Sequence, residues 1–253
     1  IANGFVLLGS FIAVRGNDQH AGNSLNAFLD LFRLGFFAQL ANGLQLMNYR
    51  FAYYLVDRFQ GNATLGMFSI TTQLAESTWL APKSLGTVLY ARVSNIEERD
   101  HQRDLTLAVL KVAVAFAALI SALLLLLPID VYRWVFGDFV HDLGPVIVWM
   151  IPGLLAMSAS QAYSHFLSGT GRVYHNTIAS GIGLVITVAV GYRWIPVMGL
   201  YGAALASSAA YTAATLYQLV VFNRISGARL RHYLPNAQDA ERIAVLRRRL
   251  LGR

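Results

Sequence analysis

Residues 105–127 read LTLAVLKVAVAFAALISALLLLL, an almost unbroken apolar run in which Lys111 is the one charged residue. A helix needs about 20 predominantly apolar residues to cross the hydrocarbon core of a bilayer, so this run is long enough to span one. Backbone groups in lipid must satisfy their own hydrogen bonds, which favours a helix over an isolated strand. The stretch therefore predicts a transmembrane helix.

The chain as a whole is also apolar, and further stretches of spanning length occur along it. Only 13% of the residues are charged and 56% are hydrophobic, whereas ordinary soluble domains carry roughly 25% charged residues. We therefore expect an all-α, polytopic membrane protein with a six-helix transmembrane lobe over residues 33–222. Its other apolar stretches of spanning length are 33–56, 64–90, 145–167, 174–195 and 199–222.

The two ends of the chain differ from this bundle. The first stretch, IANGFVLLGSFIAV (1–14), is apolar but too short to span a bilayer, and no basic region precedes it as a signal peptide would require. We expect 1–14 to be the end of a truncated transmembrane helix, 15–32 a cytoplasmic linker, and 223–253 a basic cytoplasmic tail.

Lysine and arginine orient the predicted spans. With an even number of spans, the loops 15–32, 91–104 and 168–173 lie on the same side as the tail. The opposite side holds only Arg58, Arg133 and Arg193, and the excess of positive charge marks the tail side as cytoplasmic. That side and the adjoining span ends hold fifteen of the 20 Lys and Arg: Arg15, Arg33, Arg92, Arg99, Arg103, Lys111, Arg172 and eight arginines of the tail.

The two remaining cations, Arg50 and Lys83, fall inside predicted spans, where a charge costs at least a few kcal/mol and normally faces protein or water. At about 100° per residue, the polar residues of three spans gather on one face each. These faces consist of Gln39, Asn42, Tyr49, Arg50 and Tyr53; Ser69, Gln73, Glu76, Lys83 and Thr87; and Ser158, Gln161, Ser164 and His165.

Two interpretations of these polar faces remain open. They line a common hydrated cavity, or Glu76 and Lys83 hold helices together by pairing with Arg50 or with another helix. Two cations against one carboxylate leave a net positive charge, which favours a cavity for an anionic cargo. Pro82 is expected to weaken the helix beside Lys83 and to permit a bend.

The last two spans carry rows of small residues, which allow helices to pack closely in a membrane. Residues of this kind are Gly183, Thr187 and Gly191 in one span, and Gly202, Ala206, Ala210 and Ala214 in the next. We interpret them as packing faces.

Several kinds of chemistry find no support in the sequence. The absence of cysteine excludes disulfides and thiolate sites. The six histidines show no metal-binding spacing, and neither a G-x-S-x-G elbow nor a phosphate-binding glycine loop occurs. We expect no cofactor and no bound metal, and a protein that is not an enzyme.

Four segments resemble the polysaccharide (O-antigen or exopolysaccharide repeat-unit) flippases of the multidrug/oligosaccharidyl-lipid/polysaccharide exporter superfamily. These segments are RLGFFAQLANGLQLMNYRFAYYLV (33–56), SLGTVLYARVSN (84–95), VFGDFVHDLGPVIVWMIPG (135–153) and VMGLYGAALASSAAY (197–211). The resemblance implies the C-terminal lobe of a two-lobe transporter, whose N-terminal lobe is missing from this sequence. It also implies a bacterial cytoplasmic (inner) membrane as the location.

The resemblance further implies a polyprenyl-diphosphate-linked oligosaccharide as cargo, moved to the outer leaflet by alternating access for cell-surface polysaccharide synthesis. Arg50 and Lys83 would then attract the diphosphate, and Glu76 would couple transport to an ion or proton, as in an antiporter. Other polysaccharide-assembly proteins are possible partners. The expected substrate-binding cavity also includes Tyr49, Tyr53 and Trp79, which would stack on sugars, with Gln39, Asn42, Gln73, Gln161 and His165.

Three alternatives compete with this reading. A peptidoglycan-precursor flippase of the same superfamily also handles a diphosphate lipid. A multidrug exporter for cations would need net acid in its cavity, against the excess of Arg50 and Lys83. A membrane enzyme of lipid-linked sugar assembly would need a larger extramembrane loop than any in this chain.

Overall fold

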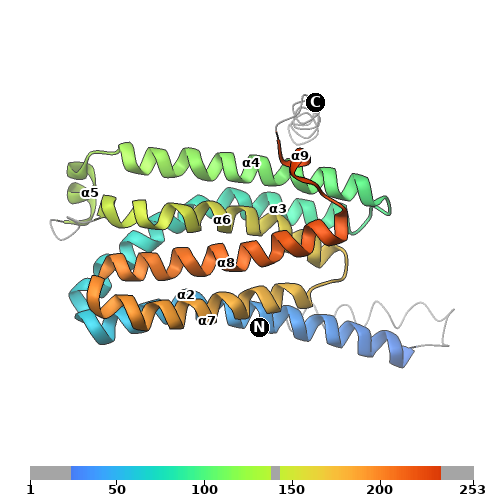
Figure 1. The fold of residues 1–253 in the computed structure, drawn as a ribbon, viewed down its shortest axis with the longest axis horizontal. Helices are drawn as coiled ribbons and strands as arrows, with labels where there is room; N and C mark the ends of the chain where they lie inside the picture. The colour runs from blue at the N-terminus through green and yellow to red at the C-terminus, as the bar shows by residue number, and fades with distance from the viewer. Residues whose placement is uncertain (1–23, 138–142, 235–253) are drawn as a thin grey trace. The chain divides into compact units, whose positions relative to one another are not determined.

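The computed structural model describes residues 24–137 and 143–234, and every regular element within them is a helix (Figure 1). The expected helix end at 1–14 lies outside the described residues, as do most of the 223–253 tail and the first part of the 15–32 linker. The elements are α2 (Ser24–Glu76), η1 (Ser77–Trp79), α3 (Leu80–Val93), α4 (Arg99–Leu126), α5 (Ile129–Phe136), α6 (Leu143–Gly169), α7 (Tyr174–Met198), α8 (Leu200–Ser226) and α9 (Leu230–Tyr233).

The chain divides into two units, Ile1–Phe36 and Phe37–Arg253. Of the first unit, the structure describes only the opening turns of α2, which begins at Ser24 and so before the predicted start at 33. The site and the packing described below belong to the second unit.

The expectation of an all-helical membrane protein is confirmed in its coarser form. Among the described residues, four helices are long and apolar enough to cross a bilayer: α4, α6, α7 and α8. They correspond to the predicted spans 105–127, 145–167, 174–195 and 199–222.

The first two predicted spans, 33–56 and 64–90, correspond to α2, η1 and α3, whose boundaries differ from the predicted ones. Gly61 has φ 81° and ψ 174°, so α2 consists of two helices that meet at a kink between the predicted stretches. Glycine adopts a positive φ without the steric cost that a Cβ imposes. A second break occurs at η1, four residues upstream of Pro82. Proline lacks the N–H that would bond to the carbonyl of Thr78, which accounts for the loosened helix there.

Hydroxyl groups occupy this second break. Ser77 Oγ donates to the carbonyl of Leu74 at 2.7 Å, and Thr78 Oγ1 donates to that of Ala75 at 2.8 Å. Such bonds help to satisfy backbone groups where a membrane helix is interrupted. A short 3₁₀ segment therefore lies just before Lys83 in the chain, where a weakened helix was expected.

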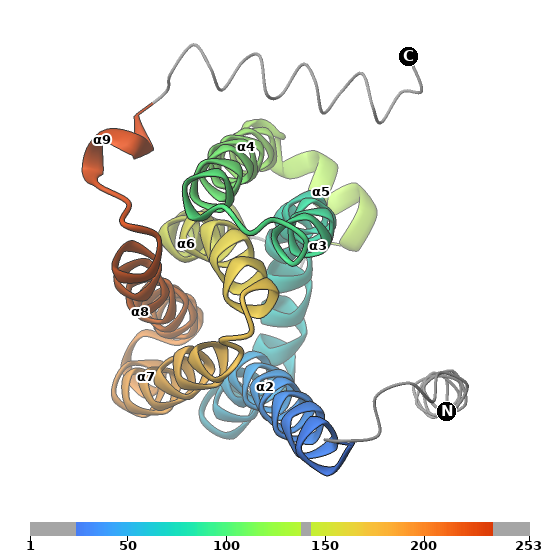
Figure 2. The same ribbon diagram turned by 90° about the vertical axis from the view of Figure 1, so that its right-hand side faces the viewer.

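α6 is the central helix of the second unit. It packs against α3, α4, α7 and α8, and the view along the helices shows it between them (Figure 2). Its fully buried side chains include Ile147, Leu154 and Phe166. A helix in this position can present side chains to several neighbours at once, and it contributes Ser160, Gln161, Ser164, His165 and Ser168 to the site described below.

The small-residue rows pack as expected, but the row on α7 faces α2. A Cβ on Gly183 would stand 2.8 Å from Asn48 Nδ2, and one on Gly191 would stand 2.6 Å from Leu55 Cδ1. On α8, a Cβ on Gly202 would stand 2.4 Å from the carbonyl oxygen of Trp194. The absence of side chains at these positions brings three helices into close contact.

Candidate functional site

A cavity of about 260 Å³ lies inside the second unit, between α2, α6, α7 and α8. Among the described residues that line it, none is Asp, Glu, Lys or Arg, and most polar groups are amides and hydroxyls. The cavity is thus polar but uncharged. Its polar lining consists of Asn42, Gln45, Asn48, Tyr49, Ser160, Gln161, Ser164, His165, Ser168, Asn176, Ser180, Tyr211 and Gln218.

One wall is a continuous chain of hydrogen bonds across α6, α8 and α7. Ser160 Oγ donates to Gln218 Oε1 at 2.6 Å, and Gln218 Nε2 donates to Asn176 Oδ1 at 3.1 Å. Asn176 Nδ2 then donates to the Ser164 carbonyl and to Ser168 Oγ, both at 3.0 Å. Buried polar groups need partners, and a fully paired network holds its helices in one arrangement.

The facing wall belongs to α2. Gln45 Nε2 donates to the Tyr49 hydroxyl at 2.5 Å, and Thr187 Oγ1 of α7 donates to Asn48 Oδ1. Near the start of α7, Thr177 Oγ1 donates to the carbonyl of Phe37 in α2 at 2.9 Å. The bonds from Thr187 and Thr177 fasten α2 to α7, and the bond from Thr187 holds the Asn48 amide at the cavity wall.

His165 of α6 connects the cavity to α3. Its imidazole lies against Gly86, where a Cβ would stand 2.2 Å from His165 Cδ2 and 2.7 Å from Nε2. Lys83, one turn earlier on α3, is close enough for its charge to act on His165. The cavity thus reaches the neighbourhood of Lys83 through a residue that belongs to its own wall.

The cavity brings together four of the predicted site residues: Asn42, Tyr49, Gln161 and His165. Sequence reasoning missed Ser160, Asn176 and Gln218, although an isolated amide in each of the last two apolar spans was a usable signal. An amide at membrane depth also requires a hydrogen-bond partner.

Arg50 and Lys83 do not line the cavity. Both are exposed, and no carboxylate of the described residues lies within 4.0 Å of either charge. The guanidinium carbon of Arg50 lies 5.6 Å from the centre of the Tyr53 ring, a cation–π distance. The two cations therefore flank the cavity instead of facing into it, Arg50 beside Tyr49 and Lys83 beside His165.

The other predicted polar site residues also lie outside the lining of the cavity. Tyr53 shares a hydrogen bond of 2.5 Å with Thr72 Oγ1, and the exposed Gln73 bonds to Ser69 of its own helix at 3.0 Å. Gln39 is exposed. Glu76, at the end of α2, is partly buried and near enough to Arg50 for the two charges to interact.

Trp79 has a packing role in this structure. Its ring is 8% exposed and lies 5.6 Å from Tyr49 and 5.4 Å from Tyr211, centre to centre. Its Nε1 is buried and has no hydrogen-bond partner among the described residues. The ring closes the cavity wall behind Tyr49 and leaves little surface on which a sugar could stack.

No protein-family model, curated protein or solved structure matches this chain. Among the described residues, no group of three or more His, Asp or Glu side chains is placed to hold a metal ion.

Proposed function

We propose that this chain is the C-terminal lobe of a membrane transporter that moves a polyprenyl-diphosphate-linked oligosaccharide from the cytoplasmic to the outer leaflet. The observation that carries the proposal is an uncharged, hydrogen-bonding cavity flanked by two cations, neither of which forms a salt bridge with a described carboxylate. Amides and hydroxyls suit the hydroxyl groups of a sugar, and lysine and arginine suit phosphate.

The volume of the cavity limits what enters it. Pockets for drug-sized ligands have volumes of roughly 300–1,000 Å³, and this one has about 260 Å³. It fits a single sugar unit of the cargo, while the rest of the glycan and the diphosphate lie on the open side, near Arg50 and Lys83. A cationic drug is a poorer fit, because no acidic side chain of the described residues lines the cavity.

The proposed topology has six spans. The stretch of α2 before Gly61 and the run from Asn62 through η1 and α3 to Val93 each exceed the roughly 20 residues that a span requires. Their exposed charges would face a preceding lobe across a hydrated space and not lipid, since an isolated charge is costly in hydrocarbon. The arginine-rich ends of the helices would lie in the cytoplasm of a bacterium.

Glu76 is the proposed coupling residue. A partly buried carboxylate beside a cation can exchange a proton or an ion when the cavity opens to the other side of the membrane. In this scheme Glu76→Gln keeps cargo binding but removes the dependence of transport on a proton or sodium gradient.

Proteoliposomes that contain the full gene product carrying this chain test the proposal. A fluorescent polyprenyl-diphosphate glycan should exchange between leaflets, and mass spectrometry should recover it unchanged. The double variant Arg50→Gln/Lys83→Gln should slow exchange at least tenfold, whereas Arg133→Gln, on α5 and 3.6 Å from Asp130, should not. Bond cleavage or glycan transfer would indicate a membrane enzyme, and full exchange by the double variant would contradict the site.

A further inference from the structure

Two leucines, one in α9 and one directly after it, are exposed. Leu230 is 85% exposed and Leu234 is 65% exposed, and the cations Arg229 and Arg231 in the same segment are exposed as well. Large apolar side chains next to cations in one short segment are typical of contact with a membrane surface. The position of the segment decides whether such contact is possible.

The segment is held firmly against the helix bundle. Gly227, with φ 70°, ends α8 and turns the chain back, and the Tyr233 hydroxyl donates to Asn223 Oδ1 at 2.6 Å. Tyr233 also packs against the apolar cluster formed around Leu105 and Phe222. The backbone N–H of Arg229 donates to His232 Nδ1 at 2.9 Å. α9 therefore has a defined face toward the bundle and a defined outer face.

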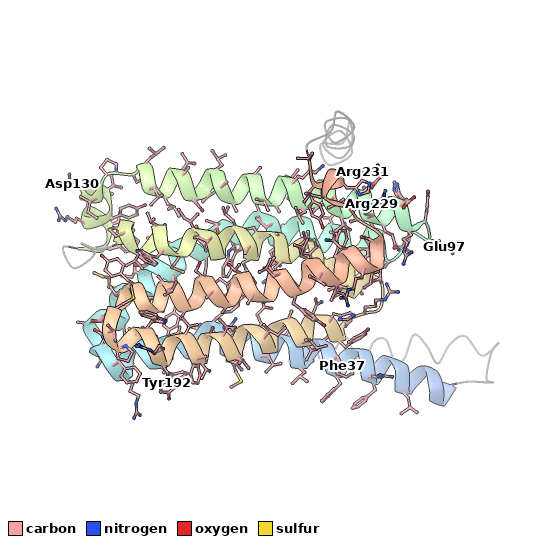
Figure 3. The ribbon with its side chains drawn as sticks, viewed as in Figure 1. Phe37, Glu97, Asp130, Tyr192, Arg229 and Arg231 are labelled. Carbon is pink, nitrogen blue, oxygen red and sulfur yellow. The ribbon has the colours of Figure 1, made fainter. Side chains whose placement is uncertain are left out.

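α9 lies alongside α4 and not beyond its end. Lys111 Nζ donates to the carbonyl of Leu234 at 2.8 Å, and Lys111 stands twelve residues after Arg99, the first residue of α4. At 1.5 Å per residue this is about 18 Å along the helix. Arg229 and Arg231 appear beside the flank of α4, whereas Glu97 marks its tip (Figure 3). The segment thus reaches the level at which the surface of α4 becomes apolar.

We infer that α9 is an interfacial anchor that binds anionic phospholipid headgroups. Leu230 and Leu234 enter the boundary of the acyl chains, and Arg229 and Arg231 meet the phosphates above them, as basic interfacial helices do. Asp104, whose charge acts on His232 of α9, lies 2.9 Å from the guanidinium of Arg103. No described carboxylate forms an ion pair with Arg229 or Arg231, so the outward charge of the patch is positive. This inference requires that the bundle spans a membrane, but it does not depend on the cargo.

The chain itself has no cysteine, so one labelled cysteine reports one position once any cysteine elsewhere in the full gene product has been replaced by serine. We would place the fluorophore NBD at Leu230→Cys, and separately at Leu234→Cys, in the full gene product in nanodiscs that hold a single copy. With phosphatidylglycerol present, NBD emission at both positions should shift to the blue and be quenched by doxyl-labelled lipid. Glu97→Cys is the matched control at the same end of the bundle, and its label should behave as it does in water.

The second arm of the experiment tests whether the charges of Arg229 and Arg231 recruit anionic lipid. Quenching by doxyl-phosphatidylglycerol should exceed quenching by doxyl-phosphatidylcholine, and each of Arg229→Gln and Arg231→Gln should lower that preference roughly fivefold. Arg133→Gln, at the opposite end, should leave it unchanged. Labels at 230 and 234 that remain in water would overturn the inference, and so would burial that is insensitive to both the anionic lipid and the two arginines.

Discussion

Gly86 of α3 lies directly against the imidazole of His165 of α6, so that a Cβ at position 86 would stand 2.2 Å from His165 Cδ2. The ring lines the cavity on one side and abuts a glycine backbone on the other. We expect Gly86→Ala to push the imidazole away or to separate α3 from α6, because overpacking typically costs about 1–3 kcal/mol. A lower melting temperature in detergent and slower leaflet exchange are the expected results.

A second substitution tests whether a clash with His165 causes the effect of Gly86→Ala. Adding His165→Ala to Gly86→Ala should restore much of the lost stability, because it removes the atoms that clash. Gly66→Ala is the matched control, since a Cβ there meets no atom within 4 Å. If Gly86→Ala melts like the wild type, the close contact between α3 and α6 is wrong.

Gly153 sets the distance between α6 and α8. A Cβ on Gly153 would stand 2.5 Å from the Cα of Ser208, and the Gly153 N–H donates to Ser208 Oγ at 2.9 Å. Backbone cannot rotate aside as a side chain can, so Gly153→Ala should lower the unfolding free energy by about 1–3 kcal/mol or more. Gly144→Ala, on the same helix with nothing within 4 Å, should be tolerated, and equal melting temperatures for the two variants would refute this packing.

Gln218 holds the hydrogen-bonded wall of the cavity together. Gln218→Leu should cost about 1–3 kcal/mol, because Ser160 and Asn176 each lose a buried partner. Gln73→Leu serves as the comparison, since the amide of Gln73 is exposed and bonds only to Ser69 one turn away. Thermal unfolding in detergent distinguishes the two variants, and a neutral Gln218→Leu would mean that the network contributes nothing to stability.

The sequence was sufficient to predict the four long apolar helices α4, α6, α7 and α8, because uninterrupted apolar length is a local property. The helix break between 56 and 64 and the loosening near Pro82 were also predictable, since Gly61 and Pro82 act on their own backbone. The start of α2 at Ser24 was not predicted, since the helix was expected to begin at residue 33. The prediction followed apolar length alone and made no use of Asn23 and Ser24, which are residue types that favour a helix start.

The sequence predicted only in part which face of α2 lines the cavity. At 100° per residue, Asn42 and Tyr49 lie on one flank of the polar face of α2, while Gln39 and Arg50 lie on the other. The cavity extends from Asn42 and Tyr49 toward Gln45 and Asn48, on the side where α7 packs. Which flank becomes enclosed depends on the neighbouring helices, and a helical projection of one segment contains no such information.

The central claim is that Arg50 and Lys83 recruit the phosphate of the cargo, while the uncharged cavity receives a sugar. The most direct measurement compares the binding of a polyprenyl-diphosphate glycan with that of the same glycan on an uncharged polyprenyl ether, using the full gene product in nanodiscs. The wild type should prefer the diphosphate at least tenfold, and Arg50→Gln/Lys83→Gln should remove that preference while binding of the uncharged analogue stays the same. Equal affinity of the wild type for both lipids, or an undiminished preference in the double variant, would contradict the account.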